Sequence, residues 1–532
     1  MKKLVALVCT LLLVLTTVSA VAEGAWNWEE EALKGLPISN EMITLTVMGS
    51  KYYLGSSDVS EYEEIAWLRE HANVDITGEL ISEDVWLDKL ALAVAADNLP
   101  DLIIRSNLTG SLVTEYGTKA QALLPLNDLI DEYAPNIKAL FEGYPYVKAL
   151  CTAADGNIYV LPKINMTPRD QHVRYWMNEA WLKALDLERP QTLDELYNVL
   201  VAFRDRDPNG NGAKDEIAVT GNNGKSIDGL ILNAYGFNVA DSTNYYDERD
   251  GKVIFIPQED GYKEYLKYMH KLYSEGLLDN EMFIQNEQQM NAKGAELKLG
   301  TFCSAASFIT VPGEEGLKYT QIGPFTSELN DTPFVPVNGG INTFATAITT
   351  ANEHPVETIK LLDWFFGRAG SVMAEDGPYG CWTWRDETKG TWDYVIPDGY
   401  DGVEAFRTGK ATIHNGFCSN LPIDFSLGAY TADSSGVDLA GWMNQQTADY
   451  YEPYFRFKFP SLTLTEDELK IVKPIETDLN LYVEGARAQF ITGELDIDNN
   501  WDSYVQNIQS MRVGSMLEQY QHAYDRYVSA MK

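Results

Sequence analysis

The chain has 532 residues, a formal net charge of −37 at pH 7 and a hydrophobic content of 45%. Such a negative charge would repel the phosphates of nucleic acids and of anionic membranes, so we exclude both as partners. A chain of this length exceeds one hydrophobic core, and its apolar content predicts two or three domains.

The N-terminus is typical of a secretory signal peptide spanning residues 1–22. Lys2 and Lys3 precede the apolar run Leu4–Leu15, and Ala20-Val21-Ala22 offers a cleavage site. The apolar run is shorter than the roughly 20 residues that a membrane span needs. Cys9 lies inside this run behind a poor lipid-attachment motif, so the sequence predicts export without a lipid anchor.

The mature chain keeps four cysteines that are far apart and form no C-x-x-C motif, which argues against a zinc site. They are Cys151, Cys303, Cys381 and Cys418. An exported chain could form one or two disulfides from them. Free buried thiols are the alternative, which we favour.

The first part of the mature chain alternates predicted strands with predicted helices. Strands are expected at Ile43–Met48, Val74–Thr77 and Leu99–Ile104, and helices at Glu61–Arg69 and Asp84–Ala96. This alternation predicts a parallel α/β sheet. Ligands of such sheets bind beside the carboxyl ends of the strands. The candidate ligand-binding residues there are Ser50, Lys51 and Arg105.

Later segments show mainly helical periodicity. Thr192 and Glu195 have the spacing of a capping box that opens a helix over Leu193–Arg204, and a strand is expected at Ile217–Thr220. The remaining predicted helices are Tyr262–Glu275, Val356–Phe366, Thr465–Ile471, Leu479–Thr492 and Val505–Ala530.

Residues 205–216, DRDPNGNGAKDE, place oxygen donors at alternate positions of a Gly-rich turn. Calcium prefers six to eight such oxygens. One register follows the EF-hand loop and uses Asp205, Asp207, Asn209, Gly210 and Glu216. A shorter register uses Asp207, Asn209, Asn211, the carbonyl of Ala213, Asp215 and Glu216. A polar surface turn without a metal remains the alternative.

The chain contains 12 Trp and 30 Tyr, which permits carbohydrate binding, because sugars stack on aromatic rings and bond to planar polar groups. Trp382 and Trp384 alternate and would share one strand face. The candidate stacking residues are Trp176, Trp382, Trp384, Tyr175 and Tyr379, and the candidates for bonding hydroxyls or a uronate are Arg174 and Arg385. A core position is the alternative for each aromatic residue. We expect Trp67, Trp86, Trp181 and Trp364, on helix faces, to be core residues.

Catalytic motifs are missing from the sequence. It contains no G-x-S-x-G elbow, no H-E-x-x-H pair and no G-x-x-x-x-G-K-[ST] phosphate loop. The carboxylate pair of a glycoside hydrolase is a spatial feature, so 78 acidic residues leave this class of enzyme open.

Several segments together resemble extracellular solute-binding protein family 1, in the long oligosaccharide-binding branch of Gram-positive ABC importers. They include LPLNDLIDEYAPN, DGNIYVLP, WMNEAWLKALDLERPQTLDELYNVLVAF, DPNGNGAKDEI, ANEHPVETIKLLDWFF and FITGELDIDNNWDSYV. The resemblance implies an α/β, two-lobed, periplasmic-binding-protein-like (type II) fold with a hinge and extra C-terminal helices. We expect residues 40–163 and 336–400 in lobe 1, and residues 164–335 and 401–532 in lobe 2, with crossings near Lys163, Pro336 and Tyr400.

The resemblance also implies a structural calcium ion in the shorter register, with Asp205 as an additional candidate ligand. The implied function is that of a monomeric extracellular binding protein, which captures an oligosaccharide and delivers it to ABC importer permease subunits without catalysis. One alternative is a secreted, calcium-stabilised glycoside hydrolase or lyase. Another is a surface adhesion module that calcium makes rigid.

Overall fold

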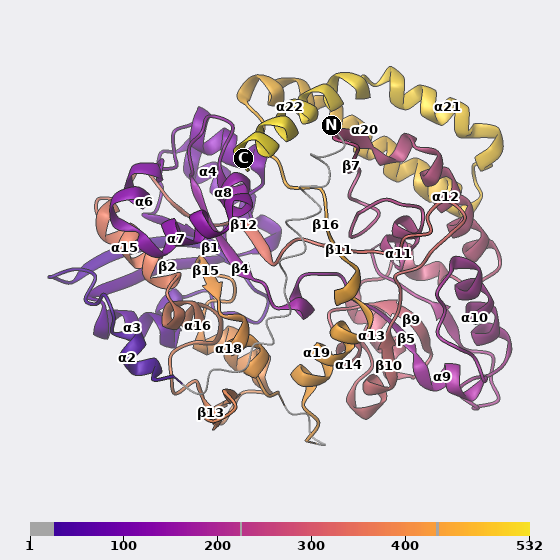
Figure 1. Ribbon diagram of the computed structural model, residues 1–532, viewed down its shortest axis with the longest axis horizontal. Helices are drawn as coiled ribbons and strands as arrows, with labels where there is room; N and C mark the ends of the chain where they lie inside the picture. The colour runs from indigo at the N-terminus through magenta and orange to yellow at the C-terminus, as the bar shows by residue number, and fades with distance from the viewer. Residues whose placement is uncertain (1–25, 224–225, 432–435, 532) are drawn as a thin grey trace.

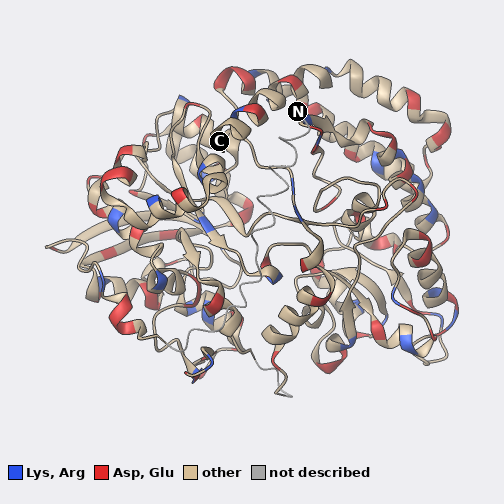
Figure 2. Ribbon diagram, viewed as in Figure 1, with Lys and Arg blue, Asp and Glu red and all other residues tan. Residues whose placement is uncertain are grey.

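The computed structural model describes residues 26–223, 226–431 and 436–531. It has two lobes, each with a β-sheet covered by helices, which confirms the predicted two-lobed α/β fold (Figure 1). Asp and Glu residues are spread over both lobes (Figure 2). The predicted signal peptide lies outside the described residues. Within those residues, no helix is long and apolar enough to span a membrane.

The first lobe contains a six-stranded sheet in the order β15-β4-β12-β3-β1-β2. β1 pairs in parallel with β2 and β3, as the alternating pattern predicts. The sheet as a whole is mixed, however, because β12 is antiparallel to both β3 and β4. The strands are β1 Ile43–Lys51, β2 Val74–Ser82, β3 Leu102–Ile104, β4 Val160–Asn165, β12 Ile341–Ile348 and β15 Ser419–Leu421.

Helices cover both faces of this sheet and bury two apolar clusters. Trp86 and Trp364 belong to these cores, as expected from their helix faces. The main helices are α2 Trp28–Ala32, α3 Glu63–His71, α4 Glu83–Ala95, α6 Asn127–Tyr133, α7 Pro135–Gly143, α8 Pro145–Cys151, α15 Pro355–Phe365, α16 Arg368–Asp376 and α18 Ile423–Gly428. Cys151, Cys381 and Cys418 are buried free thiols.

The second lobe contains a four-stranded sheet in the order β10-β5-β9-β6. Its strands are β5 Tyr175–Asn178, β6 Ile217–Val219, β9 Leu299–Cys303 and β10 Tyr319–Gln321. Its helices are α9 Glu179–Ala184, α10 Leu193–Asp205, α11 Asp228–Ala234, α12 Asp260–Ser274, α13 Glu287–Ala295 and α14 Ser307–Thr310. The Thr192 side chain accepts a hydrogen bond from the Glu195 backbone N–H, so half of the predicted capping box forms. The Glu195 carboxylate accepts from Gln191 instead.

Three C-terminal helices pack on α12 and the rest of the second core. They are α20 Glu466–Thr492, α21 Ile497–Ser510 and α22 Val513–Ala530. The sequence predicted a break after Ile471, but α20 continues through Pro474, which lacks only its own backbone donor. The Thr114 hydroxyl donates to the carbonyl of Leu464 at 2.7 Å, so the segment leading into α20 also touches the first lobe.

In the part of the chain that the structure describes, three segments connect the two cores: residues 165–174, residues 326–340 and the stretch between Phe425 of the first core and Leu464 of the second. The last of these segments carries α19 Leu439–Tyr450 and β16 Phe455–Phe457. β16 pairs in parallel with β11 Val335–Val337, which lies in the second connecting segment, residues 326–340. The expected crossings at Lys163 and Pro336 fall beside or inside these segments. Tyr400 instead packs on the first core, and residues 401–425, expected in lobe 2, place Phe406, Phe417 and Phe425 there.

Candidate functional site

One edge of the first sheet faces the crossing segments. β1 and β3 are parallel, so Ser50, Lys51 and Arg105 all lie at their carboxyl ends. The antiparallel β12 begins at this edge, and β4 ends there directly before the first crossing. The strand registers therefore bring together the three residues that the sequence placed beside a ligand.

Arg105 is the centre of a polar cluster at this edge. Its Nε donates to Ser50 Oγ at 3.0 Å, and the Ser50 hydroxyl donates to the Arg105 carbonyl at 3.0 Å. Its Nη2 lies 2.7 Å from Glu83 Oε1, and its Nη1 donates to the His414 carbonyl at 3.1 Å. The exposed Asn107 amide donates to Ser50 Oγ at 2.9 Å. Arg105 is only 8% exposed, so its guanidinium is held in one orientation.

The backbone around the cluster adopts an uncommon conformation. Arg105, Asn107 and Asn415 have φ angles of 41°, 48° and 55° in the left-handed region. Residues with side chains rarely occupy that region unless the surrounding structure holds them there, and such positions concentrate at functional sites. Here the hydrogen bonds of Arg105 supply the restraint.

Tyr52 adds an aromatic ring that sequence reasoning missed. The Arg105 guanidinium lies 5.4 Å from the centre of this ring, and the His414 ring lies 4.6 Å from it. Tyr52 and Lys51 are half-buried, whereas Tyr53 is 75% exposed. The position of Tyr52 directly after the strand-end pair Ser50-Lys51 was the available signal.

A charged network behind the cluster fixes the loop that carries His414. Lys163 forms an ion pair with Glu375 and donates to Asn415 Oδ1 at 2.7 Å. Arg407 lies 3.3 Å from Glu375 and 3.1 Å from His414 Nδ1. Burial alone would raise the pKa of Glu375, but the Lys163 and Arg407 charges lower it to about 2. Burial and Arg407 lower the pKa of His414 to about 2, so its ring is neutral.

In the second lobe, the aromatic residues at the start of β5 are buried. Trp176 is 0% exposed and donates from Nε1 to the Ser304 carbonyl at 2.9 Å. Tyr175 is 5% exposed and donates to the Ala240 carbonyl at 2.8 Å. Neither ring has a free face for a solute in this structure, because Tyr175 packs in the second core and Trp176 packs in a smaller apolar cluster of the same lobe.

Trp442 on α19 is the half-buried aromatic residue at this place, and sequence reasoning did not select it. Its ring stacks on Trp176 with 5.3 Å between ring centres and 13° between planes. No local pattern singled out Trp442 among the 12 Trp residues. Only the crossing of α19 between the lobes makes its position significant (Figure 1).

Arg174 holds the first crossing segment against the end of β9. Its guanidinium lies 2.8 Å from Asp170 Oδ1 and donates to the Ala305 carbonyl at 3.0 Å. Burial lowers the pKa of Arg174. Both of its Nη atoms bond to the protein, whereas its Nε is buried without a hydrogen-bond partner.

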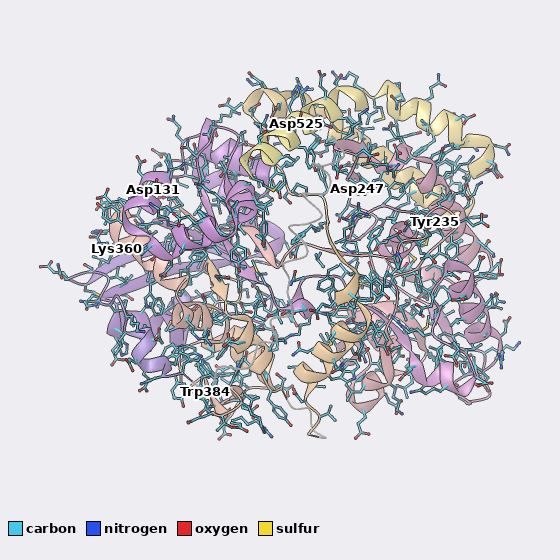
Figure 3. The ribbon with its side chains drawn as sticks, viewed as in Figure 1. Asp131, Tyr235, Asp247, Lys360, Trp384 and Asp525 are labelled. Carbon is cyan, nitrogen blue, oxygen red and sulfur yellow. The ribbon has the colours of Figure 1, made fainter. Side chains whose placement is uncertain are left out.

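The hairpin of β13 Trp382–Asp386 and β14 Thr391–Tyr394 forms the lower end of the first lobe, where Figure 3 labels Trp384. Trp382 is 0% exposed and packs among Trp28, Trp392 and Phe425, so it is a core residue in this structure. Trp384 remains half-buried with its ring edge-on to Trp382.

Two other candidates of this hairpin region are exposed. Tyr379 is 39% exposed, with its ring edge-on to Trp382. Arg385 lies 2.8 Å from Asp393 and 3.7 Å from the centre of the Tyr430 ring. Both side chains are therefore accessible at the surface of the first lobe.

The acidic loop after α10 curls around its own carboxylates. Asp207 accepts backbone hydrogen bonds from Asn211 and Gly212 at 3.1 and 3.0 Å, and the Asn211 amide donates to Asp215 at 3.0 Å. Both carboxylate oxygens of Glu216 are buried without a hydrogen-bond partner. Burial raises the pKa of Glu216, and the charges of Asp207 and Asp215 raise it further.

Over the described part of the chain, no three His, Cys, Asp or Glu side chains converge closely enough to hold a metal. The loop nevertheless fits a hard cation in one respect, because such an ion would satisfy the unpartnered oxygens of Glu216. Asp205, the first ligand of the EF-hand register, bonds to Arg204 at 2.8 Å instead.

Comparison with known proteins agrees with this architecture. The chain is 28% identical over 501 residues to the fructooligosaccharide ABC transporter substrate-binding protein FusA of Streptococcus pneumoniae serotype 4, covering 92% of this chain and 91% of FusA. The structure of S. pneumoniae FusA with kestose has a TM-score of 0.75 at 27% identity, covering 92% of this chain and 100% of that one. An EF-hand mutant of FusA with fructo-nystose has a TM-score of 0.74 at 26% identity, covering the same shares.

A more distant relative is the polygalacturonan/rhamnogalacturonan-binding protein YtcQ of Bacillus subtilis, 25% identical over 297 residues, or 55% of this chain and 56% of YtcQ. The profile of the bacterial extracellular solute-binding protein family matches residues 55–371, which is more than half of the chain. The protein therefore belongs to the bacterial extracellular solute-binding protein family, and its activity is the binding of a solute rather than its conversion.

Proposed function

We propose that the protein captures an oligosaccharide between its two lobes and delivers it unchanged to the permease subunits of an ABC importer. The observation that carries this proposal is the likeness to FusA over 92% of the chain, in sequence and in a structure that contains kestose. The preformed polar cluster around Arg105 supports it, because planar guanidinium and amide groups bond to neighbouring sugar hydroxyls.

In this proposal, the two lobes contribute different contacts. Arg105, Asn107 and Tyr52 would bond to hydroxyls from the first lobe, and Trp442 would stack on a sugar ring from the second. The accessible candidates Lys51, Tyr379, Trp384 and Arg385 would extend the surface for a longer chain. The buried residues Ser50, Tyr175, Trp176 and Trp382 and the half-buried Arg174 would position these groups from behind.

We also propose that residues 205–216 bind a structural calcium ion. The ligands would be Asp207, Asn209, Asn211, the carbonyl of Ala213, Asp215 and Glu216. The buried, unpartnered carboxylate of Glu216 supports this site, as does the existence of an EF-hand mutant of FusA. A bound cation would tie the end of α10 to the start of β6.

We further propose that the protein acts outside a Gram-positive cell as an exported monomer without a lipid anchor. The family match and the signal-peptide pattern of residues 1–22 support export. Fractionating the producing cells and determining the N-terminal residue of the mature protein tests this. A lipid-modified or uncleaved N-terminus would contradict it.

Titration calorimetry of the full chain with kestose, fructo-nystose and other neutral and acidic oligosaccharides tests the function, with product analysis of the same samples. We expect one tight oligosaccharide site and no release of free sugar. Arg105→Met should weaken binding, whereas Arg249→Met, a control in an exposed hairpin of the second lobe, should not. Released monosaccharide would favour the enzyme, and retention on polymers alone would favour the adhesion module.

A further inference from the structure

A groove of about 390 Å³ lies between α20 and α21, on the outer side of the second lobe. Its volume is within the range of roughly 300–1,000 Å³ that is usual for small-molecule sites. None of the described residues that line it is charged, although 22% of the chain is charged. A ligand of this groove would therefore be neutral.

Tyr482 forms an aromatic wall of the groove. Its ring stacks on the buried Tyr504, with 5.6 Å between ring centres and 21° between planes. Its hydroxyl accepts a hydrogen bond from the Asn507 amide at 3.0 Å. The neighbouring Leu481 also lines the groove and is 68% exposed. The groove thus offers a fixed ring and apolar surface of the kind that packs against sugar C–H groups.

Three carboxamides supply hydrogen-bonding capacity. The Asn507 amide donates to Tyr482, that of Asn500 to the Asp496 carbonyl at 2.8 Å, and that of Gln489 to Glu494 at 3.3 Å. Each carboxamide thus already donates one bond to the protein. Among the described residues, no protein group donates to their three carboxamide oxygens. These oxygens are acceptors for a ligand that carries hydroxyl donors.

Gly485 keeps the groove open. A glycine inside a helix costs about 1 kcal/mol relative to alanine, so its presence in the middle of α20 calls for a reason. Its φ angle is not among the positive ones, and a Cβ there would meet nothing within 4 Å. Neither the backbone nor a close neighbour requires glycine, but a larger side chain would fill the space in which a ligand would lie.

We propose that this groove is a second carbohydrate site, which binds one or two residues of a neutral glycan. Its aromatic wall, its free acceptors and its lack of charge fit a neutral sugar better than a peptide or an acidic saccharide. The site lies within one lobe, so it binds without closure of the lobes and does not depend on the site between them. It would keep a neutral glycan at the surface of the protein.

Saturation-transfer NMR of the full chain tests the groove, with maltotriose, cellotriose and 1-kestose as neutral probes and trigalacturonate as the acidic one. The Arg105→Met background separates the groove from the proposed site between the lobes. Gly485→Leu fills the groove, and Asn500→Ala removes an acceptor without adding bulk. Gly514→Leu is the matched control, because Gly514 is also an exposed helical glycine with nothing within 4 Å of its Cβ position.

We expect at least one neutral trisaccharide to bind, and Gly485→Leu to weaken it by about tenfold or more while Gly514→Leu leaves it unchanged. Asn500→Ala should weaken the same probe. Binding of trigalacturonate as strong as that of the neutral probes would overturn the proposal. So would neutral binding that Gly485→Leu and Asn500→Ala both leave intact, or the absence of any neutral binding in the Arg105→Met background. These failures would leave Arg105-dependent binding in the wild-type chain untouched, so they are distinct from a failure of the proposed function.

Discussion

Replacing Glu216 with Gln tests the calcium loop most directly, because it should have opposite effects on two states of the protein. It should stabilise the metal-free protein and destabilise the calcium-bound protein. Without a cation, the Glu216 carboxylate is buried without a partner near the charges of Asp207 and Asp215. A buried charge without a partner costs more than a buried neutral amide, so Glu216→Gln should be more stable than the wild type in chelator, by on the order of 1 kcal/mol. The substitution keeps the shape and removes the charge.

In the presence of calcium, the wild type should instead be more stable than Glu216→Gln. The wild type gains about 2.7 kcal/mol when the free ion is at about 100 times its Kd. For a lobe of about 150–250 residues, this gain raises the Tm by roughly 5–11 °C. The variant should gain much less, because it has lost a charged ligand.

Thermal unfolding of both proteins, with calcium and with chelator, measures this crossover. Asp205→Asn is the control within the loop, because Asp205 is not among the six proposed ligands and bonds to Arg204 in this structure. We expect Asp205→Asn to keep the calcium response. A wild type whose Tm ignores calcium, or a Glu216→Gln variant that is less stable in chelator, would refute the reasoning.

Three further predictions concern the site between the lobes. Arg105→Met should weaken oligosaccharide binding in calorimetry by about tenfold to a hundredfold, because hydrogen bonds to a charged group contribute about 1.5–3 kcal/mol. An unchanged Kd would contradict this prediction. Trp442→Ala should weaken binding and also destabilise the free protein by about 0.5–1.5 kcal/mol in urea unfolding, because the Trp442 ring stacks on Trp176. A loss of stability without a loss of binding would assign Trp442 to packing alone. His414 is neutral in the folded state, with its pKa lowered to about 2 by burial and Arg407, whereas the unfolded chain binds a proton below about pH 6.5. The wild type should therefore lose stability relative to His414→Gln as pH falls below about 6.5, by up to about 1.4 kcal/mol per pH unit, and parallel stability curves would contradict this.

Local sequence patterns predict the first three strands of the large sheet well, because each strand follows its neighbour closely in the chain and pairs in parallel. They do not predict β12, which lies much further along the chain and pairs antiparallel with both β3 and β4. Its pairing depends on contacts distant in sequence. The same limit explains why the third crossing was predicted too early, at Tyr400. No sequence pattern near Tyr400 shows that Phe406, Phe417 and Phe425 still pack in the first lobe.

Sequence patterns likewise predict only part of the candidate site, because other parts depend on contacts that are distant in sequence. Ser50 and Arg105 could be found because the ends of parallel strands meet at one edge of a sheet. Trp382 could not be separated from a solute-stacking residue, since Trp28 and Phe425, which bury it, come from distant parts of the chain. Trp442 was missed because it is partly exposed, rather than buried, by a feature distant in sequence. Its exposure depends on where α19 lies between the two lobes.

The connections between the lobes indicate how a solute would bring about closure. β11 and β16 are paired strands within two crossings, and the segment leading into α20 bonds to Thr114 of the first lobe. The Arg105 guanidinium is already oriented by Ser50 and Glu83, so little binding free energy is lost in ordering it. A ligand shifts a conformational equilibrium only by its difference in affinity for the two states. If the proposed contacts hold, a sugar that reached the Arg105 cluster alone would therefore bind without closing the lobes, and closure would require a chain long enough to contact Trp442 as well.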